Sequence, residues 1–240
     1  MSTSNLFFAL AGGILPALLW LWFWLKEDRL HPEPRKTLLL TFLAGMVVVA
    51  LALPLEQLAN YGLKKLGLIT AFSGTLLLFV WAGIEEFCKY IAAKKTALTR
   101  PEFDEPIDAV IYLITAALGF AAMENVIFLI SVTTDYGFMA GFVTGNLRFA
   151  GATLLHILSS AIIGSAIAFS FYKQKLFRLK LIIGLFLATV LHTTFNFFII
   201  RSTGDNIFQI FFPLWILIIV LLFVFEKIKK LKKLTTNKNI

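Results

Sequence analysis

The chain is short of the residues on which soluble and disulfide-stabilised domains depend. Only 15% of its 240 residues are charged, and Cys88 is its one cysteine. A single thiol excludes an internal disulfide and a cysteine-based zinc site, so we interpret Cys88 as a small buried apolar residue. The sequence also has no polar stretch long enough to form a separate soluble core.

The sequence is instead rich in hydrophobic residues, which form long apolar segments. Hydrophobic residues make up 59% of it, against about 45–50% in soluble domains. We therefore predict an all-α, polytopic membrane bundle that forms a single transmembrane domain over residues 1–240. Seven spans are expected, at 5–25, 38–58, 68–94, 107–132, 144–172, 181–201 and 207–226. Residues 138–146 are a candidate re-entrant piece before the fifth span.

The basic residues gather at alternate ends of these spans. Lys and Arg occupy the connections after spans one, three and five and the tail at 227–240, whereas the opposite side has only Lys64, Lys65 and Arg201. The positive-inside rule then predicts an outside N-terminus and a cytoplasmic C-terminus in the cell membrane. We expect the basic tail to rest on anionic lipid, and the net charge of +8 indicates no nucleic acid partner.

Two adjacent carboxylates, Glu85 and Glu86, lie within the third apolar segment. Each costs roughly 2.5–3.5 kcal/mol at hydrocarbon depth on insertion scales. Lys89 is four residues beyond Glu85 and shares its helical face, so a purely structural Glu85–Lys89 ion pair is one interpretation. It leaves Glu86 unpaired. Two carboxylates beside one ammonium group are also typical of a general acid or base.

The fourth and fifth spans carry a second polar group. Glu124 has no basic residue nearby on its own helix, so it needs a partner on another helix. Arg148 is the natural counter-ion, although it could instead bind a carboxylate or phosphate of a substrate. Asn125 offers an interhelical hydrogen bond. Asp108, at the start of the fourth span, is expected to be an N-cap.

Two histidines share helical faces with polar partners, His156 with Ser160 and His192 with Asn196. A serine nucleophile is disfavoured, because side chains four residues apart on a helix seldom have triad geometry. Zinc held by a glutamate and both histidines is an alternative, but the chain has no His-Glu-x-x-His motif. We therefore expect no cofactor, with zinc as the alternative.

The motifs taken in order resemble the PrsW family of intramembrane proteases, over about residues 80–200. They are Glu85-Glu86-x-x-Lys89, Glu105-Pro106-Ile107-Asp108, Phe120-x-x-x-Glu124-Asn125, His156-x-x-x-Ser160 and His192-x-x-x-Asn196. The family is related to the type II C-a-a-X prenyl endopeptidases. One departure is Ala109, where glycine is expected.

The resemblance implies a membrane-embedded hydrolase in which a glutamate activates water. Its catalytic set here would be Glu85, Glu86, Glu124, His156 and His192, supported by Lys89, Asn125, Arg148, Asn196, Ser160 and Asp108. It also implies a membrane-anchored substrate that resembles an anti-sigma factor.

Our hypothesis for the reaction is general-base catalysis of peptide hydrolysis. Glu85 or Glu86 takes a proton from water, and His192 and Asn196 stabilise the oxyanion. His156 or Glu124 orients the water or the base. Two other classes stay open: a proton-coupled transporter, for which the chain shows no internal repeat, and a non-catalytic scaffold.

Overall fold

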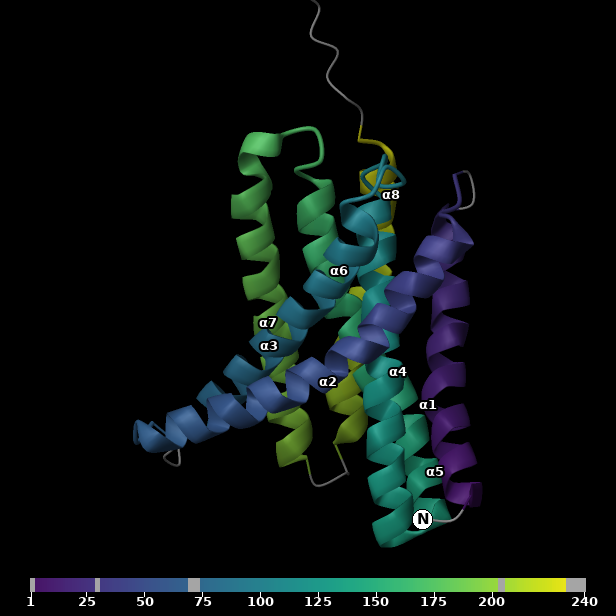
Figure 1. Ribbon diagram of the computed structural model, residues 1–240, viewed down its shortest axis with the longest axis vertical. Helices are drawn as coiled ribbons and strands as arrows, with labels where there is room; N and C mark the ends of the chain where they lie inside the picture. Colours follow the sequence, from purple (N-terminus) through teal and green to yellow (C-terminus); the bar gives the residue numbers. More distant parts are fainter. Residues whose placement is uncertain (1–2, 29–30, 69–73, 203–205, 232–240) are drawn as a thin grey trace, which may run out of the picture.

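The computed structural model describes residues 3–28, 31–68, 74–202 and 206–231. Within these ranges the regular structure is entirely helical (Figure 1). The α-helices are α1 (Thr3–Trp24), α2 (Arg35–Lys65), α3 (Gly74–Ala93), α4 (Asp108–Tyr136), α5 (Phe138–Leu147), α6 (Thr153–Ala168), α7 (Phe177–Arg201) and α8 (Ile207–Lys229). Short π-helices follow α3 (η2, Lys94–Leu98) and α5 (η3, Arg148–Ala152), and 3₁₀ turns occupy Leu25–Asp28 (η1) and Gln174–Leu176 (η4).

The predicted all-α membrane bundle is confirmed. Six helical stretches among the described residues have the length and apolar character needed to cross a membrane. The one predicted span outside these six is the third, 68–94, which corresponds to α3 and carries Glu85, Glu86 and Lys89 in its 20 residues. The prediction began this span at residue 68; the helix begins at Gly74, and residues 69–73 lie outside the described part.

The expected re-entrant piece at 138–146 is not present. Instead, α5, η3 and α6 form one continuous helical span over Phe138–Ala168. The chain reverses just before it, at Gly137, whose φ of 85° ends α4. Glycine adopts such a φ without steric cost, so the turn occurs there and the next helix starts at once.

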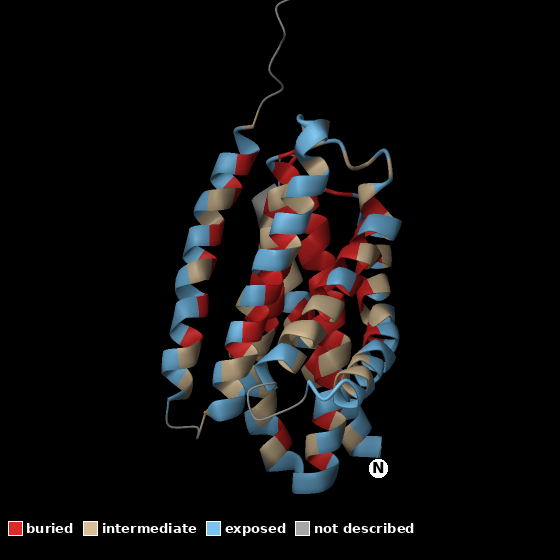
Figure 2. Ribbon diagram, turned by 90° about the vertical axis from the view of Figure 1, so that its left-hand side faces the viewer, coloured by how far each residue is buried: buried red, intermediate tan, exposed pale blue. Residues whose placement is uncertain are grey.

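Helix α4 is the centre of the bundle. It packs against α1, α2 and α6, and most of its side chains are buried (Figure 2). In Figure 1, α2 and α3 cross the more upright helices obliquely. This places α3 against α7 as well as α2, so the helix with the tandem glutamates faces the two histidine-bearing helices.

Small residues allow α2 and α4 to approach closely. A Cβ added at Gly45 would collide with the carbonyl oxygen of Ala116, and one added at Gly119 would collide with that of Phe42. Close backbone contact through small residues is how membrane helices gain packing energy where lipid is as apolar as the side chains.

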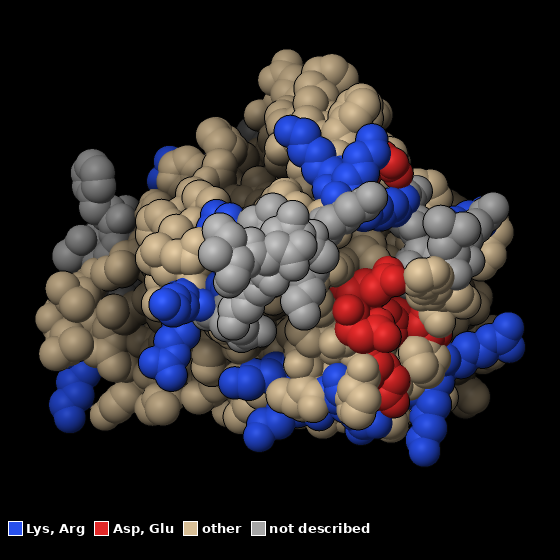
Figure 3. Space-filling view, turned by 90° about the horizontal axis from the view of Figure 1, so that it is seen from above, with Lys and Arg blue, Asp and Glu red and all other residues tan. Residues whose placement is uncertain are grey.

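The connections after α1, α3 and α6, together with the end of α8, lie at one end of the bundle. Seen from that end, basic side chains surround a group of acidic ones (Figure 3). This is the arrangement that the charge pattern predicted, while the direction of the chain across the membrane stays a prediction. Of the basic tail at 227–240, α8 includes the part up to Lys229, and residues 232–240 lie outside the described part.

Gly119→Ala should destabilise the protein by about 1–3 kcal/mol, because the added methyl group forces α2 and α4 apart. Gly62→Ala is the matched control, since a Cβ there meets nothing within 4 Å and alanine favours the helix. Thermal unfolding in detergent checks the difference. Equal melting temperatures for Gly119→Ala and the wild type would contradict this packing.

Candidate active site

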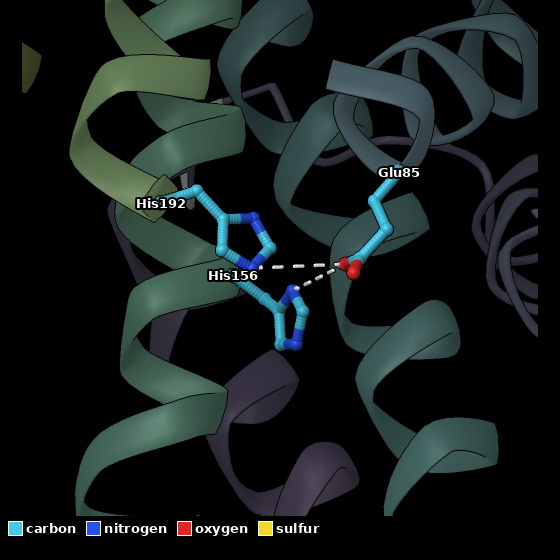
Figure 4. Close-up of side chains that lie close together, drawn as sticks. All are labelled: Glu85, His156 and His192. Atoms are coloured by element: carbon cyan, nitrogen blue, oxygen red, sulfur yellow. Dashed lines mark ion pairs between the residues drawn. The ribbon is translucent and has the colours of Figure 1, made fainter. Parts of the chain in front are cut away.

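Polar side chains from α3, α4, α6 and α7 meet inside the bundle. Figure 4 shows Glu85, His156 and His192 pointing toward one another from three helices. The Oε2 atom of Glu85 lies 3.8 Å from Nε2 of His192 and 4.0 Å from Nδ1 of His156. Both imidazoles are 2% exposed. The site is therefore enclosed by protein, where each polar group needs a protein partner or a ligand.

Glu86 is the most highly bonded member of the site. Its Oε1 accepts hydrogen bonds from Lys89 Nζ at 2.7 Å, His192 Nδ1 at 2.8 Å and Ser159 Oγ at 2.9 Å. Its Oε2 accepts a longer one from Ser160 Oγ at 3.4 Å. The side chain is fully buried, so these donors replace the water that a carboxylate would otherwise bind.

The Glu85–Lys89 ion pair is present, but the expectation that it leaves Glu86 unpaired is wrong. The Lys89 ammonium is 2.7 Å from Glu86, three residues before it, and 3.5 Å from Glu85, four residues before it. Both spacings bring side chains together on a helix. Lys89 lies closer to Glu86 because the Glu86 side chain turns inward toward α6 and α7. In consequence Glu85, not Glu86, has a carboxylate oxygen without a hydrogen-bond partner in the described structure.

Glu124 finds its partners on the next span. Its Oε2 lies 2.6 Å from Nη2 of Arg148 and 3.0 Å from Nε2 of His156. The expectation that Arg148 is the counter-ion of a glutamate is confirmed. Asn125 accepts a hydrogen bond from Nε of Arg148 and donates one to Thr153 at 3.2 Å, so the expected interhelical hydrogen bond of Asn125 is also confirmed.

The contacts of the two imidazoles determine which nitrogen carries the proton. Nδ1 of His192 faces the Glu86 carboxylate, and Nε2 of His156 faces that of Glu124, so these nitrogens are the donors. Nδ1 of His156 accepts from Lys89 at 2.7 Å. The one remaining lone pair, on Nε2 of His192, lies on the side of Glu85 Oε2, as does the Nδ1 atom of His156 that Lys89 already occupies.

Three atoms of metal-ligand type surround one space, although a metal ion there would have to displace Lys89 from Nδ1 of His156. The ligand atoms of Glu85, His156 and His192 all lie within 4.8 Å of one another. Tetrahedral zinc with bonds of about 2.0–2.1 Å would set them about 3.3–3.4 Å apart. A small inward movement would suffice, and the bond-free Glu85 oxygen suits this ligand set. The Lys89 ammonium, 3.5 Å from that oxygen, is a competing cation.

Two of the other predicted residues lie in or beside the cluster. Ser160 donates to Glu86 and not to His156, which disfavours a serine nucleophile. Asn196 is half-buried one helical turn from His192, and within the described ranges no hydrogen bond joins it to the cluster.

Asp108 lies apart from the site and is not an N-cap. It is the first residue of α4, after Ile107 at the N-cap position. Its Oδ2 accepts the backbone N–H groups of Asp104 at 3.0 Å and Glu105 at 2.7 Å. The carboxylate therefore closes the preceding loop rather than the helix. Sixteen residues separate it from Glu124, about 24 Å along the helix.

Two residues of the site were missed by the sequence analysis. Ser159, which bonds Glu86, is adjacent to Ser160 and three residues from His156. Glu56, half-buried on α2, lies close enough to Glu85 and Glu124 to interact with them electrostatically. Glu56 gave the same signal as Glu85, because it is a carboxylate within an otherwise apolar membrane helix.

Comparison with known proteins agrees with the family resemblance of the motifs. The family model described as "PrsW family intramembrane metalloprotease" matches residues 33–225. Protease PrsW of Geobacillus kaustophilus is 29% identical over 126 residues, which cover 52% of this chain and 54% of the relative. The chain thus spans about half the length of that relative. No solved structure matches the chain.

Two further relatives match over more of their length. Protease PrsW of Oceanobacillus iheyensis is 27% identical over 78% of this chain and 81% of the relative. Protease PrsW of Bacillus subtilis is 24% identical over 80% of this chain and 83% of the relative.

Fold and site together define a multi-pass membrane protein with a buried carboxylate–imidazole centre. The family match covers most of the chain, well beyond the 80–200 of the motifs. The chain belongs to the PrsW family of intramembrane proteases.

Lys89→Met should destabilise the protein by about 3–5 kcal/mol, because it leaves Glu86 buried without its cation. The control is Lys64→Met, at an exposed position on α2. Thermal unfolding in detergent measures both. The double variant Glu86→Gln/Lys89→Met should lose clearly less than the sum of the single losses. Strict additivity would show that Lys89 and Glu86 do not interact.

Proposed function

We propose that the chain hydrolyses a peptide bond of a membrane-associated protein, with the reaction centred on Glu85. One observation carries the proposal. A buried carboxylate oxygen of Glu85 without a hydrogen-bond partner in the described structure faces two imidazole nitrogens, at distances too long for direct hydrogen bonds. A water molecule in that space would donate its two hydrogens to Oε2 of Glu85 and Nε2 of His192 and be placed for activation, while Nδ1 of His156 keeps its hydrogen bond from Lys89.

Glu85 rather than Glu86 is the base in this proposal. The oxygens of Glu86 already accept hydrogen bonds from Lys89, His192 and two serines, which leaves little capacity for a water proton. Oε2 of Glu85 takes a proton from water as the water oxygen bonds to the substrate carbonyl carbon. The protonated Glu85 then gives that proton to the amine nitrogen as the C–N bond breaks.

The other polar groups of the site orient the two imidazoles and stabilise the oxyanion. Glu86 holds His192 so that the lone pair on its Nε2 points toward the reacting water, and Glu124 and Lys89 together hold the His156 ring beside it. In this state Nε2 of His192 has no proton to give an oxyanion. We therefore assign that role to the Asn196 amide, one turn away. Hydrogen bonds in such an enclosed site are stronger than in water.

A metal-dependent version of the same reaction is the second candidate. It is supported by one carboxylate and two imidazoles that lie close together, since zinc binds to such groups. Glu85, His156 and His192 would hold a divalent ion such as zinc, and Glu86 and Glu124 would orient the two imidazoles from behind. Such an ion would supply a Lewis acid and acidify its bound water.

The substrate is proposed only by class. A site enclosed by membrane helices suits a peptide bond of a membrane-anchored protein, and an anti-sigma-factor-like substrate follows from the family resemblance alone. Membrane proteomes of cells that produce the wild type or Glu85→Gln would reveal cut fragments present only with the wild type.

Glu85→Gln should lower turnover by about 10²–10⁴-fold, because the amide cannot accept the proton of water. Glu86→Gln should lower it by about 10–100-fold, through looser positioning of His192. Cleavage of a reconstituted single-span protein with a mapped cut site measures both. Glu226→Gln, at an exposed residue of α8, is the control. Full activity of Glu85→Gln would contradict the proposal, whereas a scaffold or transporter would show no cleavage at all.

Metal analysis of the purified protein separates the two mechanisms. The metal-free mechanism predicts no stoichiometric zinc and activity that survives chelation. The metal-dependent one predicts about one zinc per chain, lost in His156→Ala and His192→Ala but kept in Ser131→Ala, a serine exposed on α4. Chelation would then abolish cleavage, and added zinc would restore it.

A further inference from the structure

An apolar groove runs between α6, α7 and α8, away from the proposed active site. It consists of two cavities of about 320 Å³ and 340 Å³, and Leu191 and Leu217 line both. Each is within the size range of ligand pockets. Along α7 the groove extends from Lys180 to Phe198, about 27 Å at the helical rise and close to the thickness of the hydrocarbon core.

One polar group on the groove wall lacks a partner. Ser165 of α6 is 9% exposed, and its Oγ forms no hydrogen bond with any described residue. Other hydroxyls in these helices bond the carbonyl four residues earlier, as Thr189 and Thr193 do. A buried serine that does not do so is a donor without a partner in the described structure, and Ser165 lines the groove, so a rotation of its side chain would offer the hydroxyl to an acceptor from a ligand.

A positive charge lies at the same end of the groove. Lys180, in the first turn of α7, lines the first cavity with Ser165. This end carries the basic connections and is the predicted cytoplasmic side, where anionic lipids are concentrated. The rest of the first cavity is apolar, and the second cavity adds Thr194, Asn206 and Gln209 at the far end of the groove. The groove thus has a cationic rim, a hydroxyl donor just inside and a long apolar channel.

We propose that this groove binds an anionic glycerophospholipid. The phosphate group pairs with Lys180, an ester carbonyl accepts the hydrogen bond of Ser165, and an acyl chain lies along α7 toward Leu217. A transmembrane peptide helix does not suit the groove, because it is 10–12 Å across with its side chains and the two cavities are too small for it. The site is independent of the proposed hydrolysis, and neither depends on the other.

Lipid titration of the purified full chain in detergent tests the proposal, with bound lipid counted by native mass spectrometry. The wild type should bind phosphatidylglycerol more tightly than phosphatidylcholine. Lys180→Gln should weaken phosphatidylglycerol binding about fivefold and remove this preference. Lys175→Gln, an exposed lysine at the same end that does not line the groove, should change neither.

Two more pairs of variants locate the acyl chain and the ester. Ile183→Trp fills the groove and should weaken both lipids, whereas Ile182→Trp, on the adjacent exposed residue outside it, should weaken neither. Ser165→Ala should weaken both lipids about fivefold, and Ser131→Ala should not. Equal effects of Lys180→Gln and Lys175→Gln, or of the two tryptophan variants, would overturn the proposal in favour of ordinary surrounding lipid.

Discussion

The Glu86 carboxylate is the contact on which the centre of this protein depends. Its Oε1 atom joins α3 to α6 through Ser159 and to α7 through His192, and it fixes Lys89 on its own helix. A charged carboxylate at this depth is tolerated only because these donors surround it. The side chain of Glu86 thus bonds residues of both α6 and α7 to α3.

The tandem glutamates have different surroundings because adjacent residues point about 100° apart on a helix. Both oxygens of Glu86 accept hydrogen bonds, whereas one oxygen of Glu85, on the side of the two histidines, has no hydrogen-bond partner among the described residues. Glu124 accepts a hydrogen bond from the His156 ring, just as Glu86 accepts one from the His192 ring. Two carboxylate–imidazole pairs therefore converge on one carboxylate, an arrangement suited to placing a water molecule or a metal ion.

The rest of the bundle holds this convergence in place. Glycines at the α2–α4 crossing bring α2 close to the central helix. The π-helix at Arg148–Ala152 carries Arg148 and leads into α6 with His156, and both side chains reach one oxygen of Glu124. Helices α6 and α7 present a polar face to α3 and an apolar face to the groove beside α8. The two faces separate the proposed chemistry from the proposed lipid contact.

The helical membrane fold could be predicted from the amino-acid sequence alone, because long apolar segments in a bilayer leave the backbone few other ways to satisfy its hydrogen bonds. The sequence also identified most of the site, since Glu85, Glu124, Arg148 and the two histidines are costly in lipid unless they meet. The partners follow from how the helices pack: Lys89 lies closer to Glu86 than to Glu85, one oxygen of Glu85 has no hydrogen bond in the described structure, and Ser159 joins the cluster. Helical periodicity gives the face of a side chain but not the rotation and tilt of the neighbouring helices, and these set which atoms come within hydrogen-bonding distance.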